Sequence, residues 1–413
     1  MRVLQINNVY PAGSTGRITQ AVHRRLLRDQ QESHVIYGRG PVVREDFVMK
    51  AAPELIMKAQ SLRARVTGYS YGGSLISTWR ILRAIRDLKP DVVHVHCVNA
   101  YMVNVYRLMS YLKQQRIPTV LTLHAEFMYT GGCTHSNDCD QWLEGCCTTT
   151  RVCPEWNRLV PPSFFFNRAR QGWDRMHKAL RGFESLTVCA VSDWVRERAS
   201  RSVFFTNQRL VTVLNGIDTR AFHYRADSAA LAARLGLEGK EVVLHVTPDF
   251  QSEIKGGKHV VALARRMAGQ QNLAFVVIGP GSQWPDAPDN IRFLPPVASA
   301  EELAAYYSLA RVTLLTSIRE TFSLVTAESL CCGTPVVGFQ SGGPEYIALP
   351  GYSEFVPQGD LDALEKALTS WLHKPHHKYL ISEDALPVYG QQPMCDKYLF
   401  EYERLLQQIK PEA

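Results

Sequence analysis

Short apolar runs rich in β-branched residues alternate with longer segments of helical periodicity along the whole chain. Nearly continuous apolar strands between helices are typical of parallel sheets covered on both faces. The pattern therefore predicts an α/β protein with two doubly wound, Rossmann-like domains. The first predicted series of strands is Val3–Ile6, His34–Tyr37, Val92–His96, Thr119–Leu123, Leu186–Val191 and Leu210–Leu214. The second is Val242–Val246, Ala274–Ile278, Ile291–Leu294, Val312–Leu315, Pro335–Phe339 and Glu354–Val356.

The polar and charged stretch Thr219–Lys240 separates the two series and predicts a linker, with a short helix of its own at Leu231–Leu237. We therefore expect a first domain over residues 1–218 and a second over residues 241–390. Tyr398–Ile409 is apolar at helical spacing, which predicts a terminal helix within residues 391–413.

Length and charge limit the classes of function. A chain of 413 residues is long enough for two domains of ordinary size. Its net charge of +7 is modest, so we expect no nucleic-acid partner. The N-terminal segment lacks the apolar core of a signal peptide, and no apolar stretch approaches the roughly 18–20 residues that cross a bilayer. We therefore expect a cytoplasmic protein, in which the ten cysteines stay reduced or bind metal.

Two glutamates stand eight residues apart in the segment Arg319–Glu345. Glu320 is predicted to follow the strand Val312–Thr316, and Glu328 to lie about two turns into a helix over Phe322–Cys332. The start of such a helix attracts phosphate through unpaired N–H groups and its dipole. Two carboxylates that can hold hydroxyls, beside a helix start that can bind a diphosphate, suit a nucleotide sugar as the ligand. The alternative is that Glu320 caps the helix and Glu328 is a solvated helix residue.

Other candidate residues follow predicted strands, where ligands bind in open parallel sheets. Gly13 and Gly16 bracket the turn after the first strand, where a missing Cβ lets backbone approach a ligand, and Arg17 adds a cation. His124 ends the strand Thr119–Leu123, and Lys255 lies in a polar loop after Val242–Val246. Each has a purely structural interpretation as well: a strand-to-helix turn, a strand-end histidine and a solvated lysine.

Several of these segments together resemble family-4 retaining glycosyltransferases. The motifs that carry the resemblance are Pro90–His96 (PDVVHVH), Thr122–His124 (TLH), Asn215–Asp218 (NGID), Ile254–Gly257 (IKGG), Gly333–Val337 (GTPVV) and Ser341–Glu345 (SGGPE). They stand in the family's order and cover nearly the whole chain. The resemblance implies the GT-B fold, in which two Rossmann-like domains face a central cleft. It also implies an acceptor-side N-terminal domain, a C-terminal domain that binds the nucleotide sugar, and a final helix that crosses back to the first domain.

The resemblance implies a role for each candidate residue. Glu320 holds hydroxyls of the donor sugar, Lys255 faces the diphosphate, and His124 lies at the reacting side of the sugar, so these three are the expected catalytic residues. Glu328 is expected to bind the ribose. The remaining expected donor contacts are Gly13, Gly16, Arg17, Asn215, Thr321, Phe322, Ser323 and Leu324.

The resemblance to this family, rather than any spacing in the sequence, implies retaining transfer of a hexose from a UDP- or GDP-linked donor to a glycan or a lipid-linked acceptor in surface-polysaccharide assembly. Members of this family are described with the leaving phosphate drawing the acceptor proton, so no general base is assigned and no cofactor is expected for catalysis. Asp138-Cys139-Asp140 matches the D-x-D of metal-dependent glycosyltransferases, but its cysteine-rich setting without a preceding strand argues against that role. Glu126 is a candidate for contact with the acceptor.

One departure from the family pattern concerns the diphosphate. The family commonly has arginine just after the strand Val242–Val246, where this chain has Thr247-Pro248-Asp249. Lys258 or Arg319 could replace the lost contact, or the donor could be held less tightly. Two rival functions follow. A nucleotide-sugar epimerase of related architecture would act without an acceptor, and a non-catalytic carbohydrate-binding protein would keep the fold without turnover.

Five of the ten cysteines fall within the loop 130–154. Cys133, Cys139, Cys146 and Cys153 could supply four thiolates to a structural zinc ion, although their spacings lack a two-residue knuckle. A capsule and exopolysaccharide (colanic-acid-type) subgroup of the family has a similar segment, with TGGC, C-x-x-W and a final CP. Structural zinc and free thiols both fit this pattern.

Basic residues of the first domain predict either a solvated face or peripheral contact with anionic lipid at the inner face of the membrane. The second interpretation would suit a lipid-linked acceptor. The residues concerned are Arg17, Arg24, Arg25, Arg28, Lys58, Arg63 and Arg65.

Overall fold

The computed structural model describes residues 1–99, 101–147, 153–155, 163–281, 283–297 and 299–409. The chain divides into two compact units. Unit 1 comprises Met1–Leu214 and Met394–Ala413, and unit 2 comprises Asn215–Pro393. Unit 2 therefore includes the whole of the segment 219–240, and the last helix of the chain belongs almost entirely to unit 1.

Unit 1 is built on a parallel sheet of seven strands in the order β3-β2-β1-β4-β5-β6-β7. Val3 of β1 is paired with Ser33 on one side and with Val92 on the other. The strands are β1 (Arg2–Val9), β2 (Glu32–Arg39), β3 (Val48–Lys50), β4 (Val92–Val95), β5 (Thr119–Leu123), β6 (Leu186–Ala190) and β7 (Arg209–Thr212).

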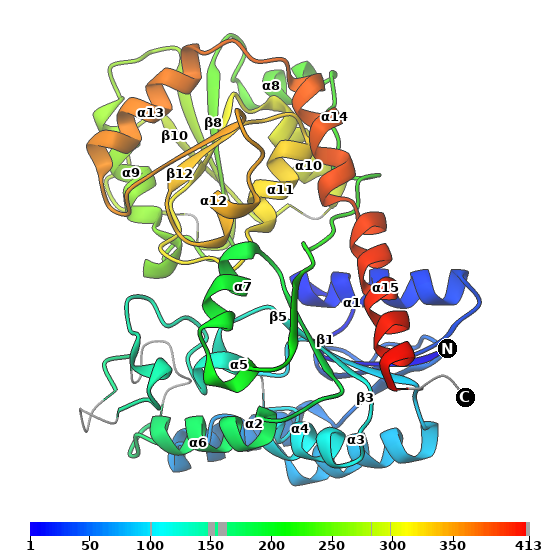
Figure 1. The fold of residues 1–413 in the computed structure, drawn as a ribbon. Coiled ribbons are helices and arrows are strands. Elements are labelled where there is room, and N and C mark those ends of the chain that lie inside the picture. The colour runs from blue at the N-terminus through cyan, green and yellow to red at the C-terminus, as the bar shows by residue number, and fades with distance from the viewer. Residues whose placement is uncertain (100, 148–152, 156–162, 282, 298, 410–413) are drawn as a thin grey trace. The chain divides into compact units, whose positions relative to one another are not determined.

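Helices cover both faces of this sheet (Figure 1). On one face, α1 and α15 bury Val22 and Tyr402 in a core with Val3, Val92 and Val120 of the sheet. The helices of unit 1 are α1 (Gly13–Arg28), α2 (Glu54–Thr67), α3 (Leu75–Leu88), α4 (Val105–Gln114), α5 (Phe127–Thr130), α6 (Ala169–Leu180), α7 (Asp193–Ser200) and α15 (Gln391–Ile409), with 3₁₀ turns η1 (Gln141–Leu143) and η2 (Val203–Phe205).

Unit 2 repeats the design with a parallel sheet of six strands in the order β10-β9-β8-β11-β12-β13. On one face, α9 and α13 bury Val260 and Leu368 against Val243 and Leu314 of the sheet. The strands are β8 (Glu241–Val246), β9 (Leu273–Ile278), β10 (Ile291–Leu294), β11 (Val312–Leu315), β12 (Val336–Phe339) and β13 (Ser353–Val356). The helices are α8 (Ala229–Leu235), α9 (Gly257–Arg266), α10 (Ala300–Leu309), α11 (Leu324–Cys331), α12 (Gly343–Ile347), α13 (Leu361–His373) and α14 (Lys378–Tyr389), with the 3₁₀ turn η3 (Glu253–Lys255).

The prediction of two doubly wound parallel sheets is confirmed. Each predicted strand overlaps an observed one, and β3 is the strand that the pattern missed, because three residues that include a lysine make no apolar run. The predicted helix from Phe322 begins two residues later, at Leu324, since Ser323 forms its N-cap. Among the described residues, no helix is long and apolar enough to cross a bilayer.

Both sheets reverse their strand order near the middle, and this reversal sets the positions where ligands are expected. In unit 1 the chain winds outward from β1 toward β3 in one direction and from β4 toward β7 in the other. In unit 2 the corresponding neighbours are β8 and β11. Loops that follow neighbouring strands at such a point diverge and leave room for a ligand at the carboxyl edge of the sheet.

Candidate functional site

The reversal point of unit 2 brings Lys255 and Glu320 together, although 65 residues separate them in the chain. Lys255 lies in η3 after β8, and Glu320 lies in the loop after β11. The Lys255 Nζ atom donates a hydrogen bond of 2.6 Å to Glu320 Oε1, with 24% of the lysine side chain and 19% of the glutamate side chain exposed. A partly exposed cation and carboxylate therefore stand side by side where a ligand is expected.

Glycine packing holds the two loops against each other. Gly256 has φ +70°, and a Cβ placed on it would lie 2.1 Å from the carbonyl oxygen of Thr316. The backbone N–H of Ile318 donates to the carbonyl of Ile254 over 2.8 Å. Only glycine tolerates both the left-handed conformation and the close approach. The Ile254–Gly257 motif thereby fixes Lys255 beside the loop that carries Glu320.

The start of α11 is built from the segment Thr321–Leu324. Ser323 forms the N-cap with φ +78° and accepts a hydrogen bond from the N–H of Thr326 over 3.2 Å. The loop after β12 packs directly on this segment, since a Cβ on Gly343 would lie 2.3 Å from the carbonyl oxygen of Thr321. Phe322 is buried, whereas Thr321 and Leu324 remain partly exposed.

Glu345 stabilises the same region from the loop after β12. Its carboxylate accepts hydrogen bonds from the backbone N–H groups of Ser341 over 3.1 Å and Gly342 over 2.8 Å. Burial raises the pKa of Glu345, while these N–H groups and the nearby Arg319 favour the charged form. Its role in the structure is thus to fix the loop that supports Thr321.

Glu328 lies one turn into α11 and is buried, with 7% of the residue exposed. Its Oε2 atom accepts a hydrogen bond of 3.1 Å from the hydroxyl of Tyr307 on α10. Burial and the neighbouring carboxylate raise the pKa of Tyr307, so that hydroxyl stays protonated and can donate. Tyr307 was not a sequence candidate, because nothing near it in the chain marks it as a partner of Glu328.

In unit 1 the loop after β1 is organised by Asn7, which is buried. Its amide nitrogen donates to Thr19 Oγ1 over 3.0 Å, and its Oδ1 accepts from the N–H of Cys97, which follows β4. Gly13 begins α1 with φ +71°, and a Cβ on Gly16 would lie 3.0 Å from Pro11 backbone, while Arg17 is exposed. The turn is therefore tight, and its first helical residues lie at the carboxyl edge of the sheet.

Asn215 stands at the start of unit 2 and is 6% exposed. Its side-chain Oδ1 atom has no hydrogen-bond partner in the part of the chain that the structure describes. The segment Asn215–Asp218 also pairs with the backbone at the end of α14. The N–H of Ile217 donates to the carbonyl of Tyr389 over 2.8 Å, and the carbonyl of Ile217 accepts from the N–H of Gln391. These two hydrogen bonds join the motif to the end of α14.

His124 belongs to a row of histidines at the carboxyl edge of the unit 1 sheet. Its Nε2 lies 3.3 Å from Nδ1 of His96, whose Nε2 lies 3.1 Å from Oε1 of Gln5. Burial lowers the pKa of His124 to about 4 and holds the pKa of His96 well below its usual range, so both rings are neutral at pH 7. Since Gln5 Oε1 can only accept, His96 donates from Nε2, and its Nδ1 then accepts a hydrogen bond from His124 Nε2.

The last helix of the chain supports this row. The ring of His94 lies 3.7 Å from the ring of His96, and its Nδ1 lies 2.6 Å from the hydroxyl of Tyr402 on α15. On its other side His94 Nε2 lies 2.8 Å from Oγ1 of Thr122, which donates to Tyr398 of α15 over 3.1 Å. His94 and Thr122 are therefore held by two tyrosines that come from the far end of the chain.

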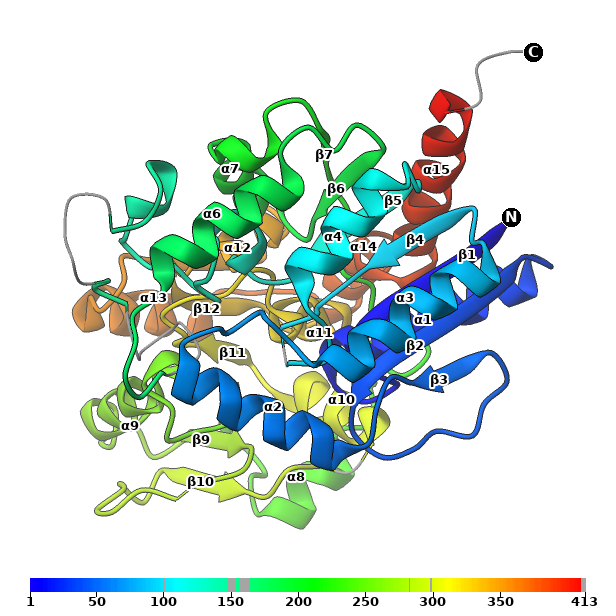
Figure 2. The same cartoon turned by 90° about the horizontal axis from the view of Figure 1, so that it is seen from below.

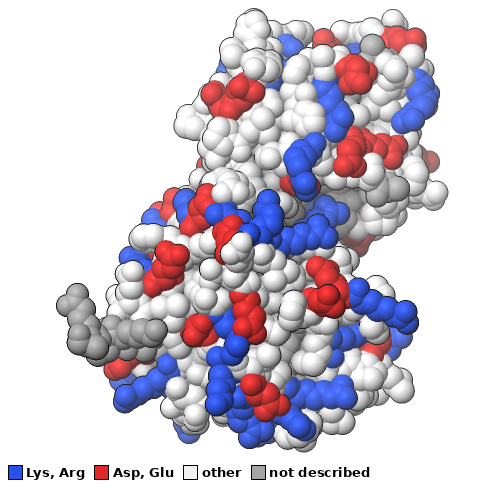
Figure 3. Space-filling model, turned by 90° about the vertical axis from the view of Figure 1, so that its right-hand side faces the viewer, with Lys and Arg blue, Asp and Glu red and all other residues white. Residues whose placement is uncertain are grey.

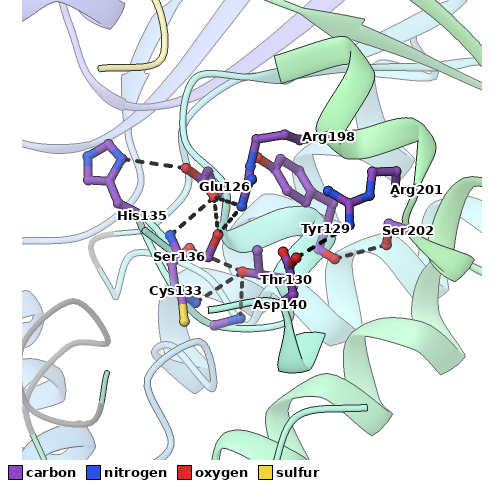
Figure 4. A network of polar contacts seen from close by, with 11 residues as sticks. Glu126, Tyr129, Thr130, Cys133, His135, Ser136, Asp140, Arg198, Arg201 and Ser202 are labelled. Atoms are coloured by element: carbon purple, nitrogen blue, oxygen red, sulfur yellow. Dashed lines mark hydrogen bonds and ion pairs between the residues drawn. The ribbon is translucent and has the colours of Figure 1, made fainter. Parts of the chain in front are cut away.

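Glu126 is fully buried and occupied by other contacts (Figure 4). Its Oε2 accepts from the N–H of Ser136 over 3.1 Å and from the Ser136 hydroxyl over 2.6 Å, and it lies 3.5 Å from a guanidinium nitrogen of Arg198 on α7. His135 Nδ1 lies 4.0 Å from Oε1. Glu126 therefore anchors the segment after His124 to α7 and the cysteine-rich loop, and an acceptor contact has no geometric support.

The five cysteines of the loop 130–154, all of which the structure describes, are not arranged as a metal centre. Among the described residues, no three His, Cys, Asp or Glu side chains are placed to hold a metal ion. Burial raises the pKa of Cys133, and the neighbouring thiols of Cys146, Cys153 and Cys139 raise it further, so the four predicted ligands lie near one another. A structural zinc ion on Cys133, Cys139, Cys146 and Cys153 therefore stays a prediction. Asp140 of the D-x-D match lies 3.4 Å from Arg201, on the surface.

The segment that replaces the family's arginine forms a compact turn. The Thr247 hydroxyl bonds to the backbone of Asp249, whose carboxylate accepts from the N–H of Gln251 over 3.1 Å. Neither residue presents a cation. Of the two predicted replacements, Lys258 is exposed in the first turn of α9, and Arg319 immediately precedes Glu320 in the chain.

Two family models match the chain. The model for glycosyltransferase family 4 matches residues 15–221, and the model for glycosyl transferases group 1 matches residues 228–385. Among curated proteins, the chain is 21% identical to WcaC of Escherichia coli K12, a glycosyl transferase whose name assigns it to colanic acid biosynthesis, over 98% of this chain and 100% of that protein. It is 32% identical to the D-inositol 3-phosphate glycosyltransferase of Mycobacteroides abscessus over 41% of this chain and 42% of that protein.

Solved structures share the fold. Sucrose-phosphate synthase from Thermosynechococcus elongatus superposes with a TM-score of 0.69 at 17% identity, covering 99% of this chain and 100% of that one. HepE from Anabaena, solved in complex with UDP-glucose, superposes with a TM-score of 0.63 at 13% identity, covering 98% and 100%. At these identities the likeness concerns the fold alone, which is the GT-B arrangement of two Rossmann-like domains.

Proposed function

The chain belongs to glycosyltransferase family 4, and from this premise we propose that it transfers a hexose from a UDP- or GDP-linked donor to a glycan or lipid-linked acceptor, with retention of anomeric configuration. The observation that carries the proposal is the contact of 2.6 Å between Lys255 and Glu320 at the reversal point of unit 2. In a nucleotide sugar the hexose is bonded directly to the diphosphate. A cation for the diphosphate and a carboxylate for sugar hydroxyls must therefore stand next to each other, as these two do.

In the proposed reaction the bond between the anomeric carbon and the diphosphate oxygen breaks, and a bond from that carbon to the acceptor oxygen forms. The acceptor proton passes to an oxygen of the leaving diphosphate. Negative charge grows on the diphosphate as its bond breaks, and Lys255 offsets that charge, which stabilises the transition state more than the ground state. Glu320 contributes by holding the hexose in position.

His124 has a more limited role in this proposal. Because its pKa of about 4 keeps the ring neutral at pH 7, it supplies no positive charge. It orients the hexose by hydrogen bonding, with its Nε2 proton directed at His96. The electrostatic part of catalysis then falls to Lys255 and the start of α11.

The remaining donor contacts are proposed from the family's pattern. In unit 2 the start of α11, formed by Thr321, Phe322, Ser323 and Leu324, faces the diphosphate. Asn215 is a further donor contact, whose buried Oδ1 atom can accept a hydrogen bond from a hydroxyl of the donor. Glu328 accepts from ribose hydroxyls, with Tyr307 fixing the orientation of its carboxylate. In unit 1, Gly13, Gly16 and Arg17 border the diphosphate.

The acceptor class is proposed from the relatives. The full-length match to WcaC supports a role in the assembly of a surface polysaccharide, and the UDP-glucose complex of HepE supports a nucleoside diphosphate as the leaving group. A nucleotide-sugar epimerase and a non-catalytic binding protein are the alternatives, and no contact among the described residues favours either.

The first experiment is a thermal-shift panel of UDP- and GDP-linked hexoses, because a ligand of the folded state raises its stability by mass action. The donor that shifts the melting temperature is then incubated with oligosaccharide and lipid-linked acceptors, and the product is analysed by NMR. We expect transfer with the anomeric configuration of the donor. Inverted product would overturn retention, donor isomerised without an acceptor would establish the epimerase, and binding without any turnover would establish the binding protein.

A further inference from the structure

Helix α2 of unit 1 carries apolar side chains on the face turned away from the protein. Leu55, Leu62 and Val66 are 78%, 59% and 41% exposed. With 3.6 residues per turn, these three positions lie within about 40° of one another around the helix. Met57 and Ala64 are buried on the opposite side, so packing against the rest of unit 1 does not account for the outer stripe.

The apolar surface continues beyond α2 at both of its ends. Beyond the C-terminal end, Phe164, Phe165 and Phe166 are 54%, 67% and 49% exposed. The N–H of Phe164 donates to the carbonyl of Arg65 over 2.7 Å, which fixes these rings beside the last turn of α2. On α3, Trp79 is 54% exposed, and the neighbouring Arg80 bonds to the carbonyl of Ala51 just before α2.

Cations flank this apolar stripe. On the helix, Lys58 and Arg65 fall on one side of the stripe and Arg63 on the other. All three are exposed, and none forms an ion pair with a residue that the structure describes. The one acid of α2, Glu54, is neutralised by Arg39 at 2.6 Å and Lys50 at 3.7 Å.

Helices α2 and α3 lie on the same outer side of unit 1, at the bottom in Figure 1 and toward the viewer in Figure 2. Lys and Arg side chains gather along this lower edge of unit 1 in Figure 3. The helix α1, which also has arginines, differs: it lacks an exposed apolar stripe, and its Arg25 is paired with Asp29 and Asp396 at 2.6 Å. Of these two helices, α2 is the one that combines an exposed apolar stripe with flanking cations that have no ion-pair partner among the described residues.

We propose that the outer face of α2, with Trp79 of α3 and Phe164–Phe166, is a docking surface for a bilayer that contains anionic lipid. Large apolar side chains enter the boundary between headgroups and acyl chains, while the flanking cations bind acidic headgroups. A protein partner would need neither the row of unpaired cations nor three consecutive exposed phenylalanines. The surface lies wholly within unit 1 and does not depend on the proposed transferase reaction.

The test is co-sedimentation of the full chain with vesicles of phosphatidylcholine alone and of phosphatidylcholine mixed with phosphatidylglycerol. We expect binding to the mixed vesicles that weakens as salt is raised, because salt screens the attraction between cations and headgroups. The double variant Lys58→Gln/Arg65→Gln should bind about fivefold more weakly for each cation removed. Leu62→Ser/Phe165→Ser should weaken binding by more than about tenfold.

Two matched variants serve as controls. Arg24→Gln/Arg28→Gln removes the same charge from α1, and Tyr379→Ser/Leu380→Ser removes apolar side chains that are 59% and 53% exposed on α14 of unit 2. Both should bind vesicles like the wild type. An equal loss in either control would overturn the location of the surface.

Trp79 gives an independent readout that needs no disruptive variant. Brominated phosphatidylcholine in the mixed vesicles should quench part of the tryptophan fluorescence, and Trp79→Phe should lose that part. An absence of sedimentation with the mixed vesicles at low salt would overturn the proposal. So would sedimentation equilibrium showing that the chain forms a dimer through this face without binding vesicles.

Discussion

The carboxyl edges of the two sheets are built by different means. In unit 2 the edge is charged: Lys255 and Glu320 touch at 2.6 Å, and glycines at close approach hold their loops. At the same edge of unit 1 the histidines are neutral, since burial lowers the pKa of His94, His96 and His124, and these rings are held by hydrogen bonds to one another and to α15. In the proposed reaction, Lys255 supplies positive charge for the diphosphate, whereas the neutral His124 orients the hexose by hydrogen bonding.

The charged edge is where the largest effect on activity is expected. Lys255→Met and Glu320→Gln should each lower kcat/KM by about a hundred- to a thousandfold, because in the proposed reaction each removes a group that acts on the donor in the transition state. The double variant should be little worse than either single one, since contacting residues that act as a unit are not additive. Steady-state transfer assays measure this.

Glu253→Gln is the matched control for that series, because Glu253 is an exposed acid in the same 3₁₀ turn as Lys255. It should retain wild-type kcat/KM. Additive losses in the Lys255 and Glu320 double variant would show that the two residues act separately and would remove the basis for pairing them in one site.

The glycine packing of unit 2 can be tested by stability. Gly256→Ala should lower the free energy of unfolding by about 3 kcal/mol or more, because it adds a clash to an unfavourable φ. Gly239 has a similar φ of +72°, but a Cβ placed on it would have no atom within 4 Å, against a contact of 2.1 Å at Gly256. Gly239→Ala should therefore cost about 1 kcal/mol. Equal losses in denaturant unfolding would mean that the close approach to Thr316 is not needed.

The neutral histidines at the carboxyl edge of the unit 1 sheet should make the stability of the protein depend on pH. The pKa of His96 is lowered in the folded state, so its contribution to stability is fully present above the unfolded pKa of 6.5 and is lost as pH falls below it. A single such histidine changes the free energy of unfolding by up to about 1.4 kcal/mol per pH unit. Denaturant unfolding between pH 5 and 6.5 should therefore give a smaller slope for His96→Gln than for the wild type. An unchanged slope would show that His96 is protonated in the folded state.

Loss of the hydrogen bond between Tyr402 of α15 and His94 should give the smallest effect on stability. Tyr402→Phe removes the partner of His94 Nδ1 and should lower the free energy of unfolding by about 1–2 kcal/mol. Tyr111→Phe is the control, because the hydroxyl of Tyr111 on α4 has no hydrogen-bond partner among the described residues. Its stability should change by less than about 0.5 kcal/mol. Equal values for the two variants would argue against the buried hydrogen bond.

The contrast between the two sheet edges also explains how much of the candidate site could be predicted from the sequence. The strands, the double winding and the loops that carry Lys255 and Glu320 follow from local apolar runs and glycine motifs, and the order of motifs places both residues after neighbouring strands. The tyrosines that hold the histidines of unit 1 could not be predicted in this way. Tyr398 and Tyr402 lie about 300 residues from His94, and they resemble ordinary core positions of a helix. Tyr307 and Arg198 were missed for the same reason, since a single buried partner leaves no local pattern.

The cysteine-rich loop 130–154 shows a second limit of prediction from the sequence. Cysteine spacing suggested a zinc site, but spacing describes the chain rather than the positions of the thiols. The thiols of Cys133, Cys139, Cys146 and Cys153 lie near one another, but no three His, Cys, Asp or Glu side chains among the described residues are placed to hold a metal ion.

Calorimetric titration of the donor tests the central claim most directly. The nucleotide sugar and the bare nucleoside diphosphate are titrated into the wild type, Lys255→Met and Glu320→Gln. We predict that Lys255→Met weakens binding of both ligands, because it removes the cation that faces the diphosphate, whereas Glu320→Gln weakens only the nucleotide sugar. Wild-type affinities for both ligands in both variants would contradict the assignment of this pair to the donor site.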